Sequence, residues 1–126
     1  MSKILVVDDE RDIQILFLQR FRKEIKNGEM DFSFAFSGEE ALTYLKNNLQ
    51  EAVLILSDIN MPGMSGLELL KHIKQEFKKP PPVVMMITAY GDSENYQKAM
   101  EFGADDFMTK PVDFNLLKEK LKEKLL

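Results

Sequence analysis

The strongest constraint on the fold of this chain is a regular alternation of short apolar runs with longer segments of helical periodicity. Five runs rich in branched aliphatic or aromatic residues have the length of strands: residues 3–8, 31–36, 52–57, 83–88 and 106–109. Each precedes a segment whose apolar residues recur every three or four positions, as at Ile13, Phe17, Phe21 and Ile25. Because most of the runs are apolar on both faces, they predict an α/β protein with a parallel sheet and helices on both faces.

Helix boundaries and domain organisation can be read from the same pattern. Four helices are expected to begin at polar caps, namely Ser37 with Glu40, Ser65 with Glu68, Asp92 and Asp113. The first helix is expected to run unbroken to Asn27-Gly28, and the last to bury Leu116 or Leu117. No linker or repeat interrupts the pattern, so residues 1–126 are predicted to form a single domain.

Composition excludes several classes of function. The 126 residues contain no Cys and one His, which removes thiolate metal sites and cysteine nucleophiles and argues against a Ser-His-Asp triad. A net charge of −4 argues against sequence-independent binding to nucleic acid or to an anionic membrane. No apolar stretch approaches the roughly 18 residues of a membrane span, and no secretory signal is present, so a cytoplasmic location is expected.

Chemically useful side chains follow the predicted strands. Asp8, Asp9 and Glu10 come after the first strand, Asp58 after the third, Thr88 ends the fourth and Lys110 follows the fifth. In an open doubly wound sheet, a site forms at the carboxyl ends of the strands. We therefore expect these side chains to meet.

Carboxylates brought together in this way favour a cation. Two like charges about 4 Å apart repel by about 4 kcal/mol at an effective dielectric of about 20. Oxygen ligands without nitrogen or sulfur suit Mg²⁺, which shares its coordination shell with phosphate oxygens, and Mn²⁺ is an alternative. A carboxylate relieved of its charge in this way can act as a nucleophile in phosphoryl transfer.

Four motifs at these strand ends carry a family resemblance. They are residues 6–10 (VVDDE), 58–63 (DINMPG), 87–89 (ITA) and 110–111 (KP). Together, in this order and spacing, they resemble the receiver domain of two-component response regulators over the whole chain. The resemblance implies a five-stranded, flavodoxin-like sheet of order 2-1-3-4-5.

The resemblance also implies the roles of the acceptor residues. Asp58 is expected to accept the phosphoryl group. Asp9 is expected to bind Mg²⁺ together with Asp58, Asp8 to assist directly or through water, and the backbone carbonyl of Asn60 to supply another ligand.

Residues around the phosphoryl group receive roles by the same resemblance. Thr88 and Lys110 are expected to contact its oxygens, and the bond from Lys110 to Pro111 is expected to be cis. Ala89 is expected to leave the group accessible, and Tyr90, with Asn60, to influence how long it persists.

Phe107 falls at the switch position, where other members carry Tyr, so an output that needs a hydroxyl there is in doubt. The implied function is a phosphorylation-activated switch, not an enzyme acting on another substrate. A histidine kinase or phosphotransfer protein supplies the phosphoryl group. The surface of the fourth helix, fifth strand and fifth helix then changes for partner binding or homodimerisation.

Other interpretations remain open for the residues taken singly. Asp9 could cap the first helix, Asp58 could form a turn, Thr88 could be structural and Lys110 could be a solvated surface residue. A phosphohydrolase of the haloacid dehalogenase type and a binding module without phosphorylation are the alternative functions. An effector domain outside this sequence is a further open question.

Overall fold

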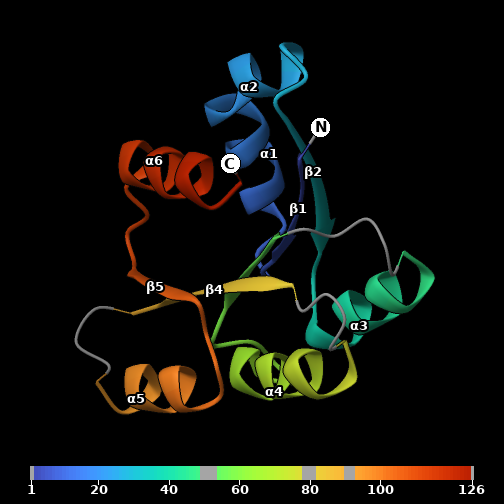
Figure 1. The fold of residues 1–126 in the computed structure, drawn as a ribbon, viewed down its shortest axis with the longest axis vertical. Helices are drawn as coiled ribbons and strands as arrows, with labels where there is room; N and C mark the ends of the chain where they lie inside the picture. Colours follow the sequence, from blue (N-terminus) through green and yellow to red (C-terminus); the bar gives the residue numbers. More distant parts are fainter. Residues whose placement is uncertain (1, 49–53, 78–81, 90–92, 126) are drawn as a thin grey trace.

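The computed structural model describes residues 2–48, 54–77, 82–89 and 93–125. Within these ranges the elements follow in the order β1 (Ser2–Val7), α1 (Asp12–Arg20), α2 (Arg22–Lys26), β2 (Met30–Ala35), α3 (Gly38–Asn47), β3 (Leu54–Asp58), α4 (Gly66–Glu76), β4 (Val83–Thr88), α5 (Ser93–Glu101), β5 (Asp106–Thr109) and α6 (Phe114–Leu125) (Figure 1). Among these described helices, none has both the length and the apolar character that crossing a membrane requires.

The five strands form one parallel sheet of order β2-β1-β3-β4-β5, which confirms the predicted fold class. Val7 at the end of β1 lies opposite Ala35 of β2 on one side and Ser57 of β3 on the other. The chain thus continues from β1 to β2 on one side of β1 and later returns as β3 on the other side of β1. This reversal opens the crevice between the carboxyl ends of β1 and β3 where a doubly wound sheet places its site.

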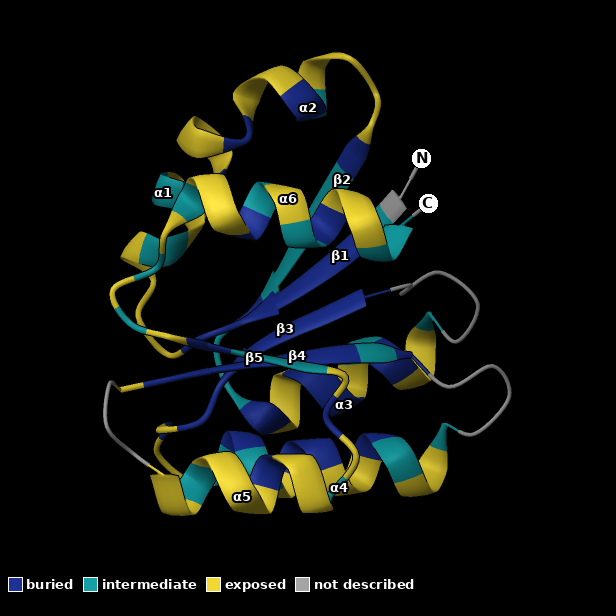
Figure 2. Cartoon of the chain, turned by 60° about the vertical axis from the view of Figure 1, so that its left-hand side comes forward, coloured by how far each residue is buried: buried dark blue, intermediate teal, exposed yellow. Residues whose placement is uncertain are grey.

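Two apolar cores hold the sheet between two layers of helices. Helices α1, α2 and α6 lie on one face, and α3, α4 and α5 lie on the other (Figure 2). Side chains alternate across a strand, so β1 sends Ile4 and Val6 into one core and Leu5 and Val7 into the other. This burial on both faces fixes the positions from which the strand ends project.

The predicted single first helix is wrong, because the chain leaves helical geometry at Phe21, with φ −105° and ψ 19°. The ring of Phe21 is fully buried, with its centroid 5.7 Å from that of Phe17 and 4.9 Å from that of Phe32. Its backbone N–H still donates to the Phe17 carbonyl, so the turn loses little hydrogen bonding while the ring enters the core. Burial of a large aromatic side chain therefore outweighs the regularity of the helix.

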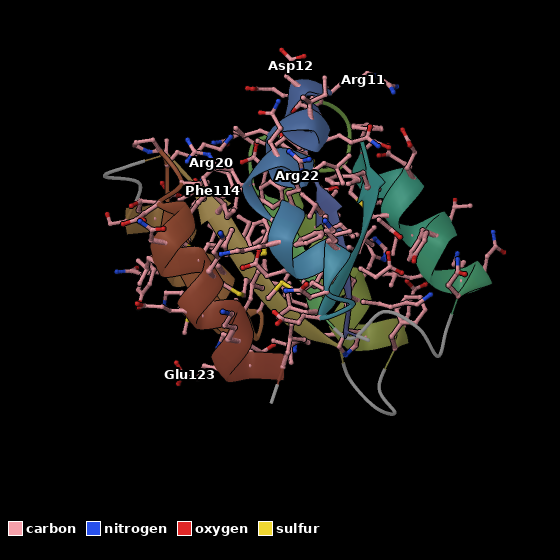
Figure 3. The ribbon with its side chains drawn as sticks, turned by 90° about the horizontal axis from the view of Figure 1, so that it is seen from above. Arg11, Asp12, Arg20, Arg22, Phe114 and Glu123 are labelled. Carbon is pink, nitrogen blue, oxygen red and sulfur yellow. The ribbon has the colours of Figure 1, made fainter. Side chains whose placement is uncertain are left out.

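Of the two leucines predicted as alternatives on the last helix, α6, Leu117 packs in the core and Leu116 is exposed. The first turn of α6 packs beside α1, where the Arg20 guanidinium carbon lies 5.4 Å from the centre of the Phe114 ring (Figure 3).

Three of the four predicted caps are present. The hydroxyls of Ser37 and Ser65 each accept a hydrogen bond from the backbone N–H three residues further on, at 3.0 and 3.2 Å. Asp113 accepts from the backbone N–H groups of Asn115 and Leu116. The fourth predicted cap, Asp92, lies outside the described residues.

Candidate functional site

Three carboxylates meet where β1 and β3 end. Asp8 and Asp9 follow β1 directly, and Asp58 is the last residue of β3. One carboxylate oxygen from each lies within 4.8 Å of the others, and we call these three residues the acidic cluster. Asp8 and Asp58 are only 6% and 5% exposed, whereas Asp9 is exposed. The cluster is therefore open to solvent on the side of Asp9.

Backbone hydrogen bonds hold Asp8 in place. Its N–H donates to the Ala35 carbonyl of β2 at 3.1 Å, which extends the β1–β2 pairing by one residue. Its Oδ1 accepts from the Glu10 N–H at 2.9 Å, which fixes the turn after β1. One oxygen of Asp8 is thus engaged with the backbone, and Oδ2 is directed toward Lys110.

The backbone around Asp58 is held from several sides. The Ser57 hydroxyl donates to the Asp58 carbonyl at 2.9 Å. The Ile59 N–H donates to the Ile87 carbonyl of β4 at 3.0 Å, and the Ile59 carbonyl accepts from the Gly66 N–H at 2.8 Å. The start of α4 is thereby attached directly to the end of β3.

Lys110 supplies the cation that faces the acidic cluster. Its Nζ lies 3.0 Å from Asp58 Oδ2, within hydrogen-bond distance, and 3.9 Å from Asp8 Oδ2. Its backbone N–H donates to the Thr88 carbonyl at 2.7 Å, which ties the loop after β5 to the end of β4. The Lys110–Pro111 peptide bond is cis.

Burial and neighbouring charges shift two pKa values in this site. Burial is the main reason that the pKa of Asp8 is raised above its usual value. The charge of Asp58 adds to this effect, and the Glu10 N–H and Lys110 oppose it. Burial acts to lower the pKa of Lys110, but the hydrogen bond and charge of Asp58 outweigh it and raise that pKa. Lys110 therefore stays protonated beside carboxylates that repel one another.

Thr88 places a hydroxyl at the end of β4. The residue is fully buried, and its Oγ1 has no hydrogen-bond partner among the residues that the structure describes. A buried hydroxyl without a partner is costly, and such a group in a native protein is commonly completed by water, an ion or a ligand. Ala89 follows and is exposed, while the predicted Tyr90 lies outside the described residues.

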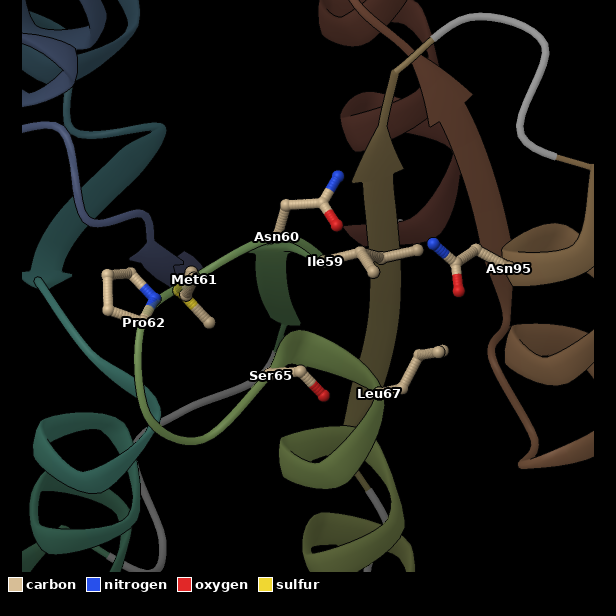
Figure 4. A pocket seen from close by; sticks show the side chains of 7 residues that line it. All are labelled: Ile59, Asn60, Met61, Pro62, Ser65, Leu67 and Asn95. Carbon is tan, nitrogen blue, oxygen red and sulfur yellow. The ribbon is translucent and has the colours of Figure 1, made fainter.

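Asn60 lies beyond β3 with an exposed side chain. It lines a groove of about 460 Å³ between the loop after β3, the start of α4 and α5; the lining residues are Ile59, Asn60, Met61, Pro62, Ser65, Leu67 and Asn95 (Figure 4). Asn60 comes two residues after Asp58, but no residue of the acidic cluster lines this groove.

Phe107 on β5 is half-buried and makes an aromatic contact that the sequence did not predict. Its centroid lies 4.9 Å from that of Tyr96 on α5, with the two planes at 90°. Tyr96 is 45% exposed, so this edge-to-face pair links β5 to the outer surface of α5.

The donor set of the acidic cluster fits a hard divalent cation. Among the described residues, the cluster offers three carboxylates and no sulfur or imidazole ligand. The carboxylates of Asp8 and Asp58 are buried. Mg²⁺ prefers such oxygen ligands and retains waters, for which the exposed side at Asp9 leaves space. The Lys110 ammonium lies against the cluster, and the unpartnered Thr88 hydroxyl ends the neighbouring strand β4; both groups suit an anionic, oxygen-rich ligand.

Sequence reasoning missed two residues that contact the backbone of Asp58. Ser57 is a polar side chain in an otherwise apolar central strand, and that irregularity was the available signal. A Cβ on Gly66 would lie 2.0 Å from the Asp58 carbonyl oxygen, so only glycine fits there. The sequence gives no sign of that contact, because it depends on how α4 docks.

Comparison with known proteins gives consistent matches over nearly the whole chain. A sequence model described as "Response regulator receiver domain" matches residues 4–122. "Sporulation initiation phosphotransferase F" of Bacillus subtilis is 35% identical over 124 residues, which cover 98% of this chain and 94% of that protein. A response regulator receiver domain protein from Methanospirillum hungatei has a structure with a TM-score of 0.83 at 34% identity, covering 99% of this chain and 94% of that one.

Many relatives are longer than this chain. A "Cyclic di-GMP phosphodiesterase" of Thermotoga maritima is 35% identical over 125 residues, which cover 99% of this chain but 31% of that protein. Several other curated relatives are matched over 25% to 53% of their length. The matched region thus also occurs as one part of larger proteins.

Proposed function

The chain belongs to the receiver domain family of two-component response regulators, and on this premise we propose that it is a phosphorylation-activated switch whose phosphoacceptor is Asp58. Receiver domains of this family are phosphorylated on an aspartate, and they receive the group from histidine kinases or phosphotransfer proteins. The observation that carries the proposal is the Lys110 ammonium held 3.0 Å from the buried Asp58, inside a cluster of carboxylates. Membership of the receiver family also favours this function over the phosphohydrolase alternative.

The proposed chemistry is one phosphoryl transfer. A carboxylate oxygen of Asp58 attacks the phosphorus of a phosphohistidine. The new O–P bond forms as the P–N bond breaks, and the electron pair of that bond returns to the imidazole nitrogen. Lys110 neutralises charge on the transferred oxygens, and the Thr88 hydroxyl donates to one of them. The product adds roughly −1.5 to −2 charge units at Asp58.

We assign the cation site to the acidic cluster and the backbone carbonyl of Asn60, with Mg²⁺ as the preferred ion and Mn²⁺ as the alternative. Receiver domains bind Mg²⁺, and the all-oxygen donor set of this cluster suits it. When bound, the ion offsets the repulsion between the carboxylates and the phosphoryl oxygens.

The proposed output surface combines α5, β5 and α6, the fourth helix, fifth strand and fifth helix of the sequence prediction. Thr88 moves toward the phosphoryl group, and Phe107 turns into the space that it leaves. This change alters the surface for partner binding or homodimerisation. Shifting such an equilibrium from 1:99 to 99:1 takes about 5.5 kcal/mol, so a smaller, partial shift is expected.

The remaining parts of the proposal concern turnover and context. The chain catalyses its own phosphorylation and dephosphorylation only, with Ala89, Asn60 and Tyr90 controlling access and lifetime. Residues 1–126 act as one receiver domain in the cytoplasm and bind neither nucleic acid nor membrane directly. The effect of phosphorylation in the cell depends on the partner that recognises the output surface.

The proposal is tested by incubating the protein with acetyl phosphate and Mg²⁺ and measuring its intact mass. We expect wild type to gain one phosphoryl group that is stable to acid and labile to alkali. Asp58→Asn should gain none, because an amide is not a nucleophile for this transfer. Asp12→Asn is the matched control, since Asp12 is an exposed acid on α1 outside the acidic cluster, and it should be modified like wild type.

Three results contradict the assignment. A mass gain in Asp58→Asn, or none in wild type, removes Asp58 as the acceptor. A label mapped by peptide mass to Asp8, with rapid multiple turnover, indicates a phosphohydrolase that uses the first strand.

A further inference from the structure

We propose that Ser57 is a positioning residue for the phosphoacceptor, because its buried hydroxyl fixes the main-chain carbonyl of Asp58. This inference rests on the proposed role of Asp58 and adds a residue that acts through it. Ser57 itself does not face the acidic cluster, since successive side chains of β3 point to opposite faces of the sheet.

Ser57 is a polar residue in apolar surroundings. The residue is 1% exposed, and its strand partners Val7 and Met86 belong to the apolar core beneath α3, α4 and α5. A hydroxyl in such a core is unfavourable unless it forms a hydrogen bond. Here it donates to the Asp58 carbonyl at 2.9 Å, so it engages the backbone of the adjacent acceptor residue.

The same carbonyl is covered on another side by the first residue of α4. A Cβ on Gly66 would come within 2.0 Å of the Asp58 oxygen and 2.7 Å of the Ile59 Cα. Because Gly66 lies so close, a water molecule has little room to replace the Ser57 hydroxyl. The carbonyl is therefore held between one donor and one close packing contact.

This arrangement determines the direction in which the chain leaves β3. The hydroxyl acts on the peptide that joins Asp58 to Ile59, and Ile59 is itself bonded to Ile87 and Gly66. Rotation of that peptide shifts the Asp58 carboxylate. It also shifts the backbone carbonyl groups that follow along the chain as far as Asn60. Transfer chemistry depends on placing the nucleophile to within a fraction of an ångström, so loss of the hydroxyl should slow phosphorylation without removing any group from the cluster.

The test compares Ser57→Ala with Ser57→Thr and with Ile55→Val as the matched control. Ile55 lies two residues earlier on β3, on the same face, and is fully buried, so its variant weakens the same core without touching the Asp58 carbonyl. Initial rates with acetyl phosphate and Mg²⁺ are measured at a temperature where circular dichroism shows every variant folded. A second readout needs neither Mg²⁺ nor phosphate: the carbonyl ¹³C chemical shift of Asp58.

We expect Ser57→Ala to be phosphorylated about five- to tenfold more slowly, with an upfield shift of the Asp58 carbonyl. Ile55→Val should match wild type in both measurements, and Ser57→Thr, which keeps a hydroxyl, should recover most of the rate. An unchanged rate and carbon shift in Ser57→Ala refutes the positioning role, as does an equal slowing in Ile55→Val or in folded Ser57→Thr. Failure of wild type to take up a phosphoryl group refutes the proposed function instead, whatever the variants do.

Discussion

Neutralising Asp8 should stabilise the metal-free protein, although it removes a proposed cation ligand. Asp8→Asn keeps an oxygen that can accept from the Glu10 N–H, so the turn after β1 is preserved. It deletes a negative charge that is 6% exposed and lies beside Asp58 and Asp9. The variant therefore separates the electrostatic cost of the acidic cluster from its local structure.

The magnitude can be worked from the distances. At an effective dielectric of about 20, a like charge within 4.8 Å costs Asp8 about 3.5 kcal/mol or more, and Lys110 at 3.9 Å returns about 4.3 kcal/mol. These two contributions nearly cancel, and the exposed Asp9 adds a smaller repulsion. The remaining contribution is the desolvation of a buried carboxylate, which costs several kcal/mol for a fully buried ion. Because this cluster is open to solvent at Asp9, we expect Asp8→Asn to gain about 1 kcal/mol.

The gain should depend on pH in a defined direction. The pKa of Asp8 is raised in the folded state, so the native protein binds this proton more tightly than the unfolded chain does. Wild type therefore loses stability as the pH rises from 3.8 through the folded pKa, and the variant does not. The advantage of Asp8→Asn should be full above the raised pKa of Asp8 in the folded state and disappear below pH 3.8.

Urea denaturation with and without Mg²⁺ measures these effects. Mg²⁺ at ten times its Kd should add about 1.4 kcal/mol to wild type and much less to the variant, which reverses their order. Glu119→Gln controls for the change in net charge, because Glu119 is exposed on α6 away from the cluster. A metal-free Asp8→Asn less stable than wild type at pH 7, or an advantage that persists below pH 3.8, would refute this reasoning.

Three further substitutions test the surroundings of the cluster. Lys110→Met should lower the free energy of unfolding, measured in urea, by about 1–3 kcal/mol, because Asp58 loses its cation. This difference should be present below pH 10.5 and vanish as the pH rises through the raised pKa of Lys110. A difference that persists in more alkaline solution contradicts the account. Gly66→Ala should cost about 3 kcal/mol or more by overpacking against the Asp58 carbonyl, so an unchanged Tm excludes the close contact. Burial acts to raise the pKa of Asp106, but hydrogen bonds from Lys120 and the backbone outweigh it and lower that pKa. Asp106→Asn should therefore lower the free energy of unfolding by less than about 1 kcal/mol at pH 7, and by nothing once the pH has fallen from 3.8 through the lowered pKa. A loss of stability that survives in acid indicates a packing effect instead.

The main features of the candidate site could be predicted because they depend on the direction and order of the strands. In a parallel sheet all strands end at one edge, and the family resemblance implied that the first and third strands are neighbours, so Asp8 and Asp58 were expected to meet near Lys110. The division of Asp8 and Asp9 into a buried and an exposed carboxylate could not be predicted, since both follow β1 directly. It depends on the Asp8 N–H continuing the ladder to Ala35.

Features that depend on packing between distant segments were not predictable. The break at Phe21 has no Gly or Pro signal, and it arises because the ring is buried against Phe17 and Phe32. The choice of Leu117 over Leu116 depends on how α6 is rotated against the sheet. Periodicity shows that a helix has an apolar face but not which neighbouring position faces the core.

The pair formed by Phe107 and Tyr96 sets a limit on how the proposed switch can work. Phe107 has no hydroxyl to form a hydrogen bond, but its ring centroid lies 4.9 Å from that of Tyr96, with the two planes at 90°. An aromatic pair contributes about 0.5–1.5 kcal/mol beyond burial, whereas a complete change of state takes about 5.5 kcal/mol. The contact can therefore favour the half-buried position of Phe107 without locking it. Most of the energy for the change must come from the phosphoryl group acting on the unpartnered Thr88 hydroxyl and on Lys110, whose backbone N–H is bonded to Thr88. A receiver domain built in this way should respond with a graded shift of α5 and β5 more readily than with an all-or-none change.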